Sequence, residues 1–122
     1  MPITKANVRC YLRTHRRVWG LTQLELASLL GLRSASHLSR IEHGKYAPRV
    51  EVAIACQVIF GIPPSAMFPH VYTLVEEEVI RNIYAYHLAL GNTKTLSGLR
   101  KRQLCELVLQ RAVTKTSHLE GI

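Results

Sequence analysis

Four glycines divide the first half of the chain into short segments that each have the apolar spacing of a helix. Gly20, Gly31, Gly44 and Gly61 follow these segments directly, and glycine is the residue favoured just beyond a helix C-terminus. Alternation of apolar and polar residues, typical of a half-buried strand, is hard to find. The pattern predicts an all-α fold. Helices are expected over 5–19, between Thr22 and Gly31, over 35–43 and over 50–60, followed by one extra helical turn over 65–68.

Two residues have the surroundings of a helix N-cap. Thr22 is followed three positions later by Glu25, which is the spacing of a capping box. Ser34 stands just before the third segment and is expected to cap it. The inward faces of the first three helices are then expected to contain the following residues: Val8, Tyr11, Leu12, His15, Val18, Trp19, Leu26, Ala27, Leu30, Leu38 and Ile41.

Beyond Pro69 the pattern changes to that of longer helices. Apolar residues recur every three or four positions, as on one face of an amphipathic helix: Tyr72, Val75, Val79, Ile83, Tyr86 and Leu90. A turn is expected over 91–95, Ser97 is the expected cap of a last helix, and the polar tail after Thr114 is expected to fray. We therefore predict a bundle over 1–69 and a two-helix extension over 70–122.

The charge of the chain is unevenly distributed. Its 122 residues include 16 lysines and arginines against 8 acids, for a formal net charge of +8. All the acids are glutamates, so mechanisms that need an aspartate are excluded. Residues 1–69 hold nine basic and three acidic side chains, and residues 70–122 hold seven and five. This surplus on the first part indicates a polyanionic partner, usually nucleic acid and less often an anionic membrane.

The cysteines and the apolar runs point to a soluble protein of a reducing compartment. Cys10, Cys56 and Cys105 are odd in number and lack Cys-x-x-Cys spacing, which argues against a disulfide framework or a zinc site. Residues 1–10 lack the apolar stretch of a signal peptide. No apolar run approaches the ~18 residues that a membrane span needs. A cytoplasmic location is expected, with no metal, no cofactor and no membrane partner.

The segments on either side of Gly31 have the pattern of two short helices joined by a tight turn, a helix-turn-helix. The second of them begins with the small residues Ala35 and Ser36, which suits entry into a major groove ~12 Å wide. His37, Ser39 and Arg40 alternate with inward residues and are expected to project outward. An arginine there can donate two hydrogen bonds to guanine O6 and N7.

A longer ordered set of residues surrounds this motif: Leu12-Arg13, Arg16, Gly20-Leu21-Thr22-Gln23, Glu25-Leu26-Ala27, Gly31, Leu38-Ser39-Arg40-Ile41-Glu42, Gly44-Lys45, Pro48 and Gly61-Ile62. Through these residues the stretch 12–68 resembles the Xre/Cro-type helix-turn-helix family of phage repressors and bacterial regulators. The turn before Leu38 is one residue longer than the common family pattern, with Arg33 as the extra residue. Helix 50–60 departs again at Cys56 and Gln57, where the family has an apolar pair.

The resemblance implies a five-helix bundle whose third helix, 35–43, reads DNA. Base contacts are implied for Ala35, Ser36, His37 and Arg40. Phosphate contacts are implied for Gln23, Ser34, His43, Lys45 and Tyr46, with Arg33 as a further candidate. An internal ion pair is implied between Arg16 and Glu42.

Together these features predict a sequence-specific DNA-binding regulator of transcription, nucleoid-associated and working as a homodimer on a palindromic operator. The stripe from Tyr72 to Leu90 is the expected dimer or partner surface, although packing of this helix within the chain would produce the same stripe. RNA polymerase or another protein is a further candidate partner. The alternative is an adaptor or antitoxin-like protein that acts mainly through protein contacts. No group of residues resembles a catalytic site, so an enzyme is not expected.

Overall fold

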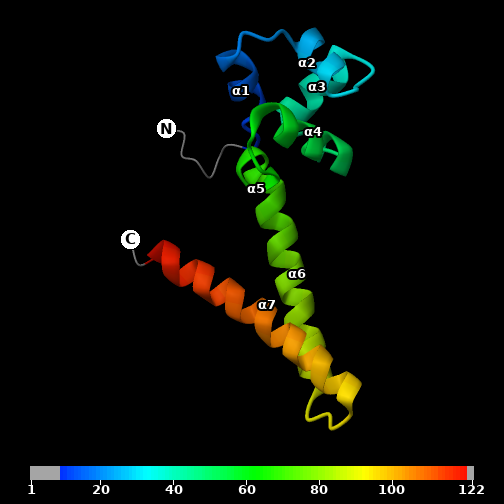
Figure 1. The fold of residues 1–122 in the computed structure, drawn as a ribbon, viewed down its shortest axis with the longest axis vertical. Helices are drawn as coiled ribbons and strands as arrows, with labels where there is room; N and C mark the ends of the chain where they lie inside the picture. The colour runs from blue at the N-terminus through cyan, green and yellow to red at the C-terminus, as the bar shows by residue number, and fades with distance from the viewer. Residues whose placement is uncertain (1–8, 121–122) are drawn as a thin grey trace. The chain divides into compact units, whose positions relative to one another are not determined.

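The structure is a computed structural model that describes residues 9–120, and side chains as far as residue 115. The described residues form seven α-helices, shown in Figure 1: α1 (Leu12–Val18), α2 (Gln23–Leu29), α3 (Ala35–Glu42), α4 (Val50–Phe60), α5 (Pro64–Met67), α6 (Pro69–Leu90) and α7 (Leu96–Glu120). The all-α prediction is confirmed. The chain divides into two compact units, the first ending at Leu74 and the second beginning at Val75.

The predicted N-caps of α2 and α3 are confirmed. Thr22 Oγ1 accepts from the backbone N–H of Glu25, whose carboxylate accepts in return from the N–H of Thr22, so the capping box is complete. Ser34 Oγ accepts from the N–H of His37 at the start of α3. Between the two helices Gly31 has a φ of +74°, a left-handed conformation that glycine adopts without steric cost. These local signals fix where the two helices end and begin.

The first helix departs from its prediction at both ends. Residues 5–8 lie outside the described residues, and 9–11 are not helical, so α1 begins at Leu12. The N–H of Tyr11 donates to the carbonyl of Met67 at 2.9 Å, and that of Leu12 lies 3.4 Å from Cys10 Sγ, so these groups have partners outside a helix. Val18 and Trp19, predicted to face inward, are each 71% exposed. That prediction was wrong: α1 ends at Val18, and its buried residue is Leu12 at the opposite end of the helix.

One hydrophobic core holds the five helices of the first unit together. It contains Leu12, Leu26, Ala27, Leu30, Leu38, Ile41, Val52, Cys56, Met67 and Phe68. The inward positions predicted for α2 and α3 are all among them. Leu38 and Ile41 anchor α3 to this core, and burying each such side chain contributes about 1.5–3 kcal/mol. The opposite side of α3 is thereby left facing solvent.

In the second unit, α6 and α7 run antiparallel (Figure 1). Positions spaced by four and three residues are the least exposed in both helices, at 76, 80, 83, 87 and 90 of α6 and at 98, 102, 105, 109 and 112 of α7. We call these the packed rows, and Val108 beside them is half-buried too. Cys105 at their centre has no exposed surface. Lys115 Nζ lies 2.8 Å from Glu76 Oε2 near one end of the pair, and Arg102 donates to the carbonyl of Gly91 at the other.

Two predictions about α7 were wrong. The hydroxyl of Thr95, not that of Ser97, accepts from the N–H of Gly98 at 3.0 Å, so Thr95 caps the helix and Ser97 lies within its first turn. The tail after Thr114 was expected to fray, yet the helix continues to Glu120. Within 9–120, no helix is both long enough and apolar enough to cross a membrane.

Candidate nucleic-acid interface

The solvent side of α3 carries a short row of small, polar and basic side chains. Ser36 and Arg40 are exposed, whereas Ala35 and His37 are half-buried beside the core. The four residues predicted to read bases therefore lie on one helix, with the smallest two in its first turn. Ala35 and Ser36 leave the start of α3 slim enough to approach the floor of a groove.

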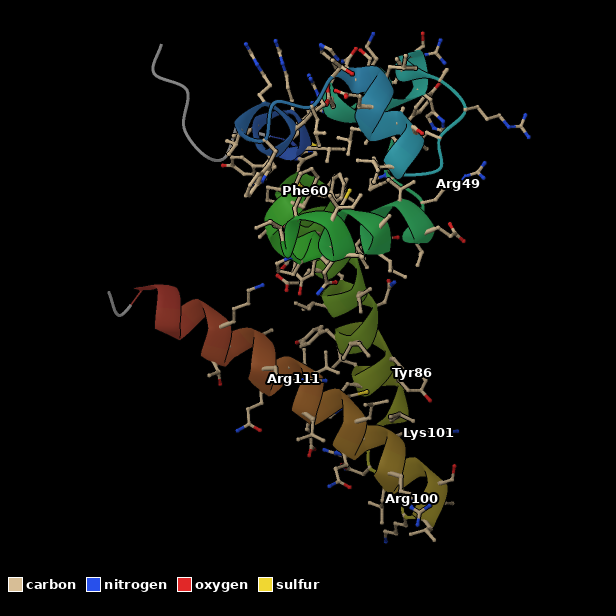
Figure 2. All side chains as sticks on the ribbon, turned by 45° about the horizontal axis from the view of Figure 1, so that its top comes forward. Arg49, Phe60, Tyr86, Arg100, Lys101 and Arg111 are labelled. Carbon is tan, nitrogen blue, oxygen red and sulfur yellow. The ribbon has the colours of Figure 1, made fainter. Side chains whose placement is uncertain are left out.

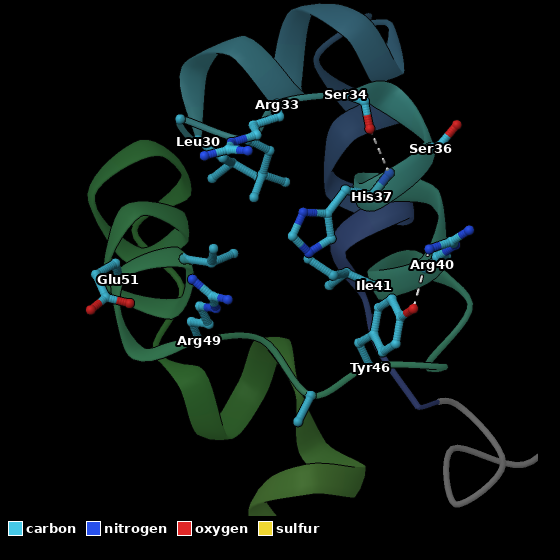
Figure 3. Close-up of a pocket in the computed structure, with 14 residues that line it drawn as sticks. Leu30, Arg33, Ser34, Ser36, His37, Arg40, Ile41, Tyr46, Arg49 and Glu51 are labelled. Carbon is cyan, nitrogen blue, oxygen red and sulfur yellow. Dashed lines mark hydrogen bonds between the residues drawn. The ribbon is translucent and has the colours of Figure 1, made fainter.

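Tyr46 organises the two larger side chains of this row. The guanidinium of Arg40 donates from Nη1 to the Tyr46 hydroxyl at 3.2 Å, and its Cζ lies 5.8 Å from the centre of the ring. The His37 ring meets the same ring edge-on, at 6.2 Å between centroids. Figure 3 shows the three side chains side by side. The tyrosine that was predicted to contact phosphate is thus in direct contact with two predicted base readers.

A groove runs from this cluster to the start of α4. It has a volume of about 1040 Å³, and Arg33 and Arg49 line it together with Arg40 (Figure 3). Glu51 is the acidic residue in its lining. Sequence reasoning did not single out Arg49, although it is a basic residue directly before a predicted helix. Three arginines around one opening make this region suited to an anionic backbone.

The remaining predicted phosphate contacts are divided. Arg33, Ser34 and Lys45 are exposed around the α2–α3 turn and after α3. The His43 ring is turned back onto its own helix, with Nδ1 2.7 Å from the Ser39 carbonyl. Two of these side chains thus have partners inside the domain, His43 on the Ser39 carbonyl and Ser34 as the cap of α3.

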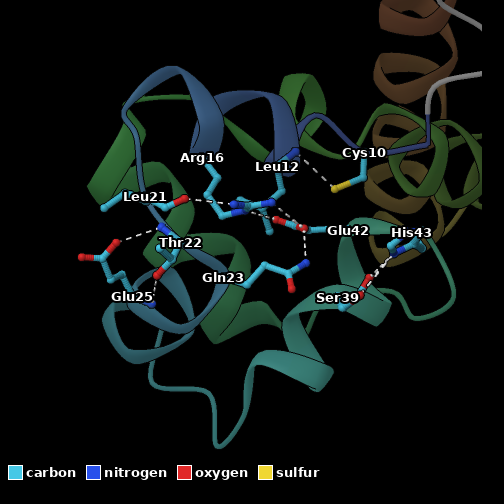
Figure 4. Close-up of polar contacts among 10 residues, drawn as sticks. All are labelled: Cys10, Leu12, Arg16, Leu21, Thr22, Gln23, Glu25, Ser39, Glu42 and His43. Carbon is cyan, nitrogen blue, oxygen red and sulfur yellow. Dashed lines mark hydrogen bonds and ion pairs between the residues drawn. The ribbon is translucent and has the colours of Figure 1, made fainter.

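Behind α3 a buried polar network connects α1, α2 and α3 (Figure 4). Arg16 Nε lies 2.7 Å from Glu42 Oε2, and the side chains of these residues are 12% and 0% exposed. Gln23 Nε2 donates to Glu42 Oε1 at 2.9 Å, and Arg16 Nη1 donates to the Leu21 carbonyl at 2.9 Å. The side-chain amide of Gln23 therefore faces Glu42, which leaves its backbone N–H for a phosphate. The network fixes the angle between α3 and its neighbours.

The two cysteines of the first unit belong to the core and not to this surface. Burial raises the pKa of the Cys10 thiol to about 11 and that of the Cys56 thiol to about 12. Both are therefore neutral near pH 7 and poor nucleophiles. Among the described residues, no group of three or more His, Cys, Asp or Glu side chains could hold a metal ion.

A comparison with protein-family models agrees with this geometry. Residues 8–67 match the family model described as a helix-turn-helix domain. This part of the chain is a helix-turn-helix domain. Searches of curated proteins and of solved structures returned no significant match. In helix-turn-helix domains the second helix of the motif lies in the major groove and the first crosses the backbone. Here these are α3 and α2, and the match ends at the last residue of α5.

The apolar stripe predicted after the domain is divided by the structure. Ile83 and Leu90 belong to the packed row of α6. Tyr72, Val75, Val79 and Tyr86 are exposed to between 42% and 55%. The predicted stripe therefore combined residues from two rows of α6 that are offset by one residue.

Proposed function

We propose that the helix-turn-helix domain binds double-stranded DNA sequence-specifically, with α3 in the major groove, and that the protein regulates transcription. The observation that carries the proposal is the polar row of exposed Ser36 and Arg40 and half-buried His37, on a helix anchored by buried Leu38 and Ile41. The arginine-lined groove beside it supplies positive charge next to the reading helix. The resemblance to Xre/Cro-type regulators supports the same assignment. Its site of action would be the nucleoid.

In this proposal the side chains have separate roles. Ala35, Ser36, His37 and Arg40 contact base edges, and Arg40 donates to a guanine. Arg33, Ser34, Lys45 and the backbone of Gln23 contact phosphates, which sets the register of the domain on the duplex without reading sequence. Tyr46 accepts from Arg40 and keeps its own hydroxyl proton available for a phosphate oxygen.

We further propose that residues 1–69 bind DNA and that residues 70–122 join two copies into a homodimer. Two reading helices related by a two-fold axis would then occupy successive major grooves ~34 Å apart on a palindromic operator. RNA polymerase or another protein bound at the promoter would be the downstream partner.

The test is selection and sequencing of random duplex DNA bound by the full chain at one fixed salt concentration, because attraction to phosphate depends strongly on salt. We expect an enriched palindrome. Arg40→Ala should reduce discrimination at one base pair of each half-site by about 5- to 150-fold, since a bidentate contact contributes ~1–3 kcal/mol. Lys45→Ala should weaken all sequences alike and lower the salt slope by about one. A bound pool without enrichment, identical for Arg40→Ala, would refute the proposal.

The adaptor alternative is favoured by one observation, the large apolar residues left exposed on α6 and α7. Under that reading, protein contacts of the second unit would be the main activity. The Arg40→Ala variant separates the two functions, because it should reduce sequence discrimination by a regulator and leave partner binding by an adaptor unchanged.

A further inference from the structure

The second unit leaves a second apolar row on α6 uncovered. This row occupies positions 75, 79, 82, 86 and 89, each one residue before a member of the packed row. It reads Val75, Val79, Asn82, Tyr86 and Ala89, with no charge along its length. Val75, Val79 and Tyr86 are 55%, 46% and 44% exposed. The other flank of α6 is interrupted by Glu77 and Arg81.

The matching row of α7 has a different character. Two antiparallel helices are related by a local two-fold axis, so the positions one residue before each packed row lie on the same side of the pair. In α7 these are 97, 101, 104, 108 and 111, which hold Ser97, Lys101, Leu104, Val108 and Arg111. One side of the pair is therefore apolar on α6, and both apolar and basic on α7. We call this side the outer face; two of its residues, Tyr86 and Arg111, are among those labelled in Figure 2.

We propose that the outer face binds a second copy of this chain, with α6 of each copy lying on α7 of the other. The proposal rests on the proposed function in one respect, because the operator is the DNA that this dimer would bind. Such an arrangement has its two-fold axis parallel to the helix pair, and it forms a four-helix bundle in which every neighbour is antiparallel. Tyr86 of one copy then packs near Leu104 of the second copy.

Charge decides between the two ways of stacking the outer faces. If α7 lay on α7, Lys101 of one copy would approach Arg111 of the second copy, and like charges would meet twice. With α6 on α7, the two-fold axis is parallel to the helices, so each residue lies at the same height along the bundle in both copies. The contact between Lys115 and Glu76 shows which parts of α6 and α7 share a height. Glu78, exposed about half a turn from Glu76, then reaches the height of Arg111 of the second copy.

The experiment is sedimentation of the full chain without DNA, over a range of protein concentrations. We expect a dimer whose Kd rises about tenfold in Glu78→Arg and in Arg111→Glu, since the two-fold axis places each pair twice and each exposed pair contributes ~0.2–1 kcal/mol before it becomes repulsive. The double variant should return to within about threefold of the parent. The matched control Arg100→Glu, an exposed cation on α7 at a height where α6 of the second copy carries no glutamate, should change Kd less than about twofold.

The apolar contact has its own matched pair of variants. Val79→Gln/Tyr86→Gln on the outer face should abolish the dimer at micromolar concentration. Tyr84→Gln/Leu88→Gln, on the other flank of α6 and more exposed, should not. Glutamine, arginine and glutamate are good helix formers, so circular dichroism should show an unchanged helix content in each variant.

The outcomes separate this inference from the proposed function. A monomer at all concentrations, or a tighter dimer in Arg111→Glu, would overturn the inference, because the second result is expected only if α7 lies on α7. A dimer with the expected charge reversal but no enriched DNA sequence would leave the inference standing and refute the DNA-reading proposal. Monomers that enrich a single half-site would overturn the inference and leave the DNA-reading proposal standing.

Discussion

The buried pair of Arg16 and Glu42 should be the most sensitive point of the helix-turn-helix domain. In Arg16→Met the Glu42 carboxylate, 0% exposed, would keep the amide of Gln23 as its remaining side-chain partner. Removing one member of a buried pair costs about 3–5 kcal/mol, because the other charge is left desolvated. Two unit charges about 4 Å apart at an effective dielectric constant near 20 attract by about 4 kcal/mol, which agrees with that range.

The loss is large beside the total stability of a small domain, which is about 5–15 kcal/mol. We expect Arg16→Met to lower the free energy of unfolding by about 3–5 kcal/mol and the midpoint temperature by at least about 12 °C. Replacing both charges, in Arg16→Met/Glu42→Leu, removes the buried charge altogether. The double variant should therefore recover to within about 2 kcal/mol of the parent.

The assay is urea unfolding of the full chain, followed by circular dichroism and by the fluorescence of Trp19, the single tryptophan. Arg13→Met is the matched control, because Arg13 lies exposed on the same helix and its loss should change stability by no more than about 0.5 kcal/mol. A cost below about 1 kcal/mol for Arg16→Met would refute the reasoning. So would a double variant no more stable than the single one.

Three further predictions concern other groups. Nδ1 of His87 is buried without a hydrogen-bond partner in the described part of the chain, so His87→Leu should stabilise the second unit by about 1 kcal/mol, measured as a higher midpoint temperature; a lower one would mean that Nδ1 has a partner. The N–H and hydroxyl of Thr22 lower the pKa of Glu25 below 4.5, so the parent should be more stable than Glu25→Gln at pH 7, and the difference should vanish as the pH falls from 4.5 through the lower folded-state pKa; a pH-independent difference would contradict this. Because their pKa values are raised to about 11 and about 12, Cys10 and Cys56 should react with N-ethylmaleimide at pH 7.5 far more slowly in the folded chain than in urea, as followed by mass spectrometry; equal rates would contradict their burial.

The ends of most helices could be predicted from the residues beside them. The cap at Ser34 and the glycine at 31 act through groups within about four residues, so they operate in any chain that places them there. The same holds for α4, whose observed bounds of Val50–Phe60 equal the predicted ones. The error at the start of the first helix arose where a partner distant in sequence intervened, because the Met67 carbonyl accepts from the N–H of Tyr11.

The candidate site could be predicted in part for the same reason. A helix period places Ser36 and Arg40 on the side opposite Leu38, with His37 on the flank, whatever surrounds them. The contact of Arg40 with Tyr46 depends on the path of the loop after α3, and the place of Arg49 in the groove depends on how α4 packs. Neither has a periodic signal along the chain.

Local chemistry and periodicity alone therefore account for the all-α class, the helix-turn-helix and the polar side of its second helix. Which of two apolar rows on α6 is covered is a different kind of question. Ile83 and Tyr86 both fit a helical stripe, because a helix can bear apolar residues on more than one side. Only the position of α7 separates them, since burial is a property of two surfaces in contact and a pattern along one helix describes just one of them.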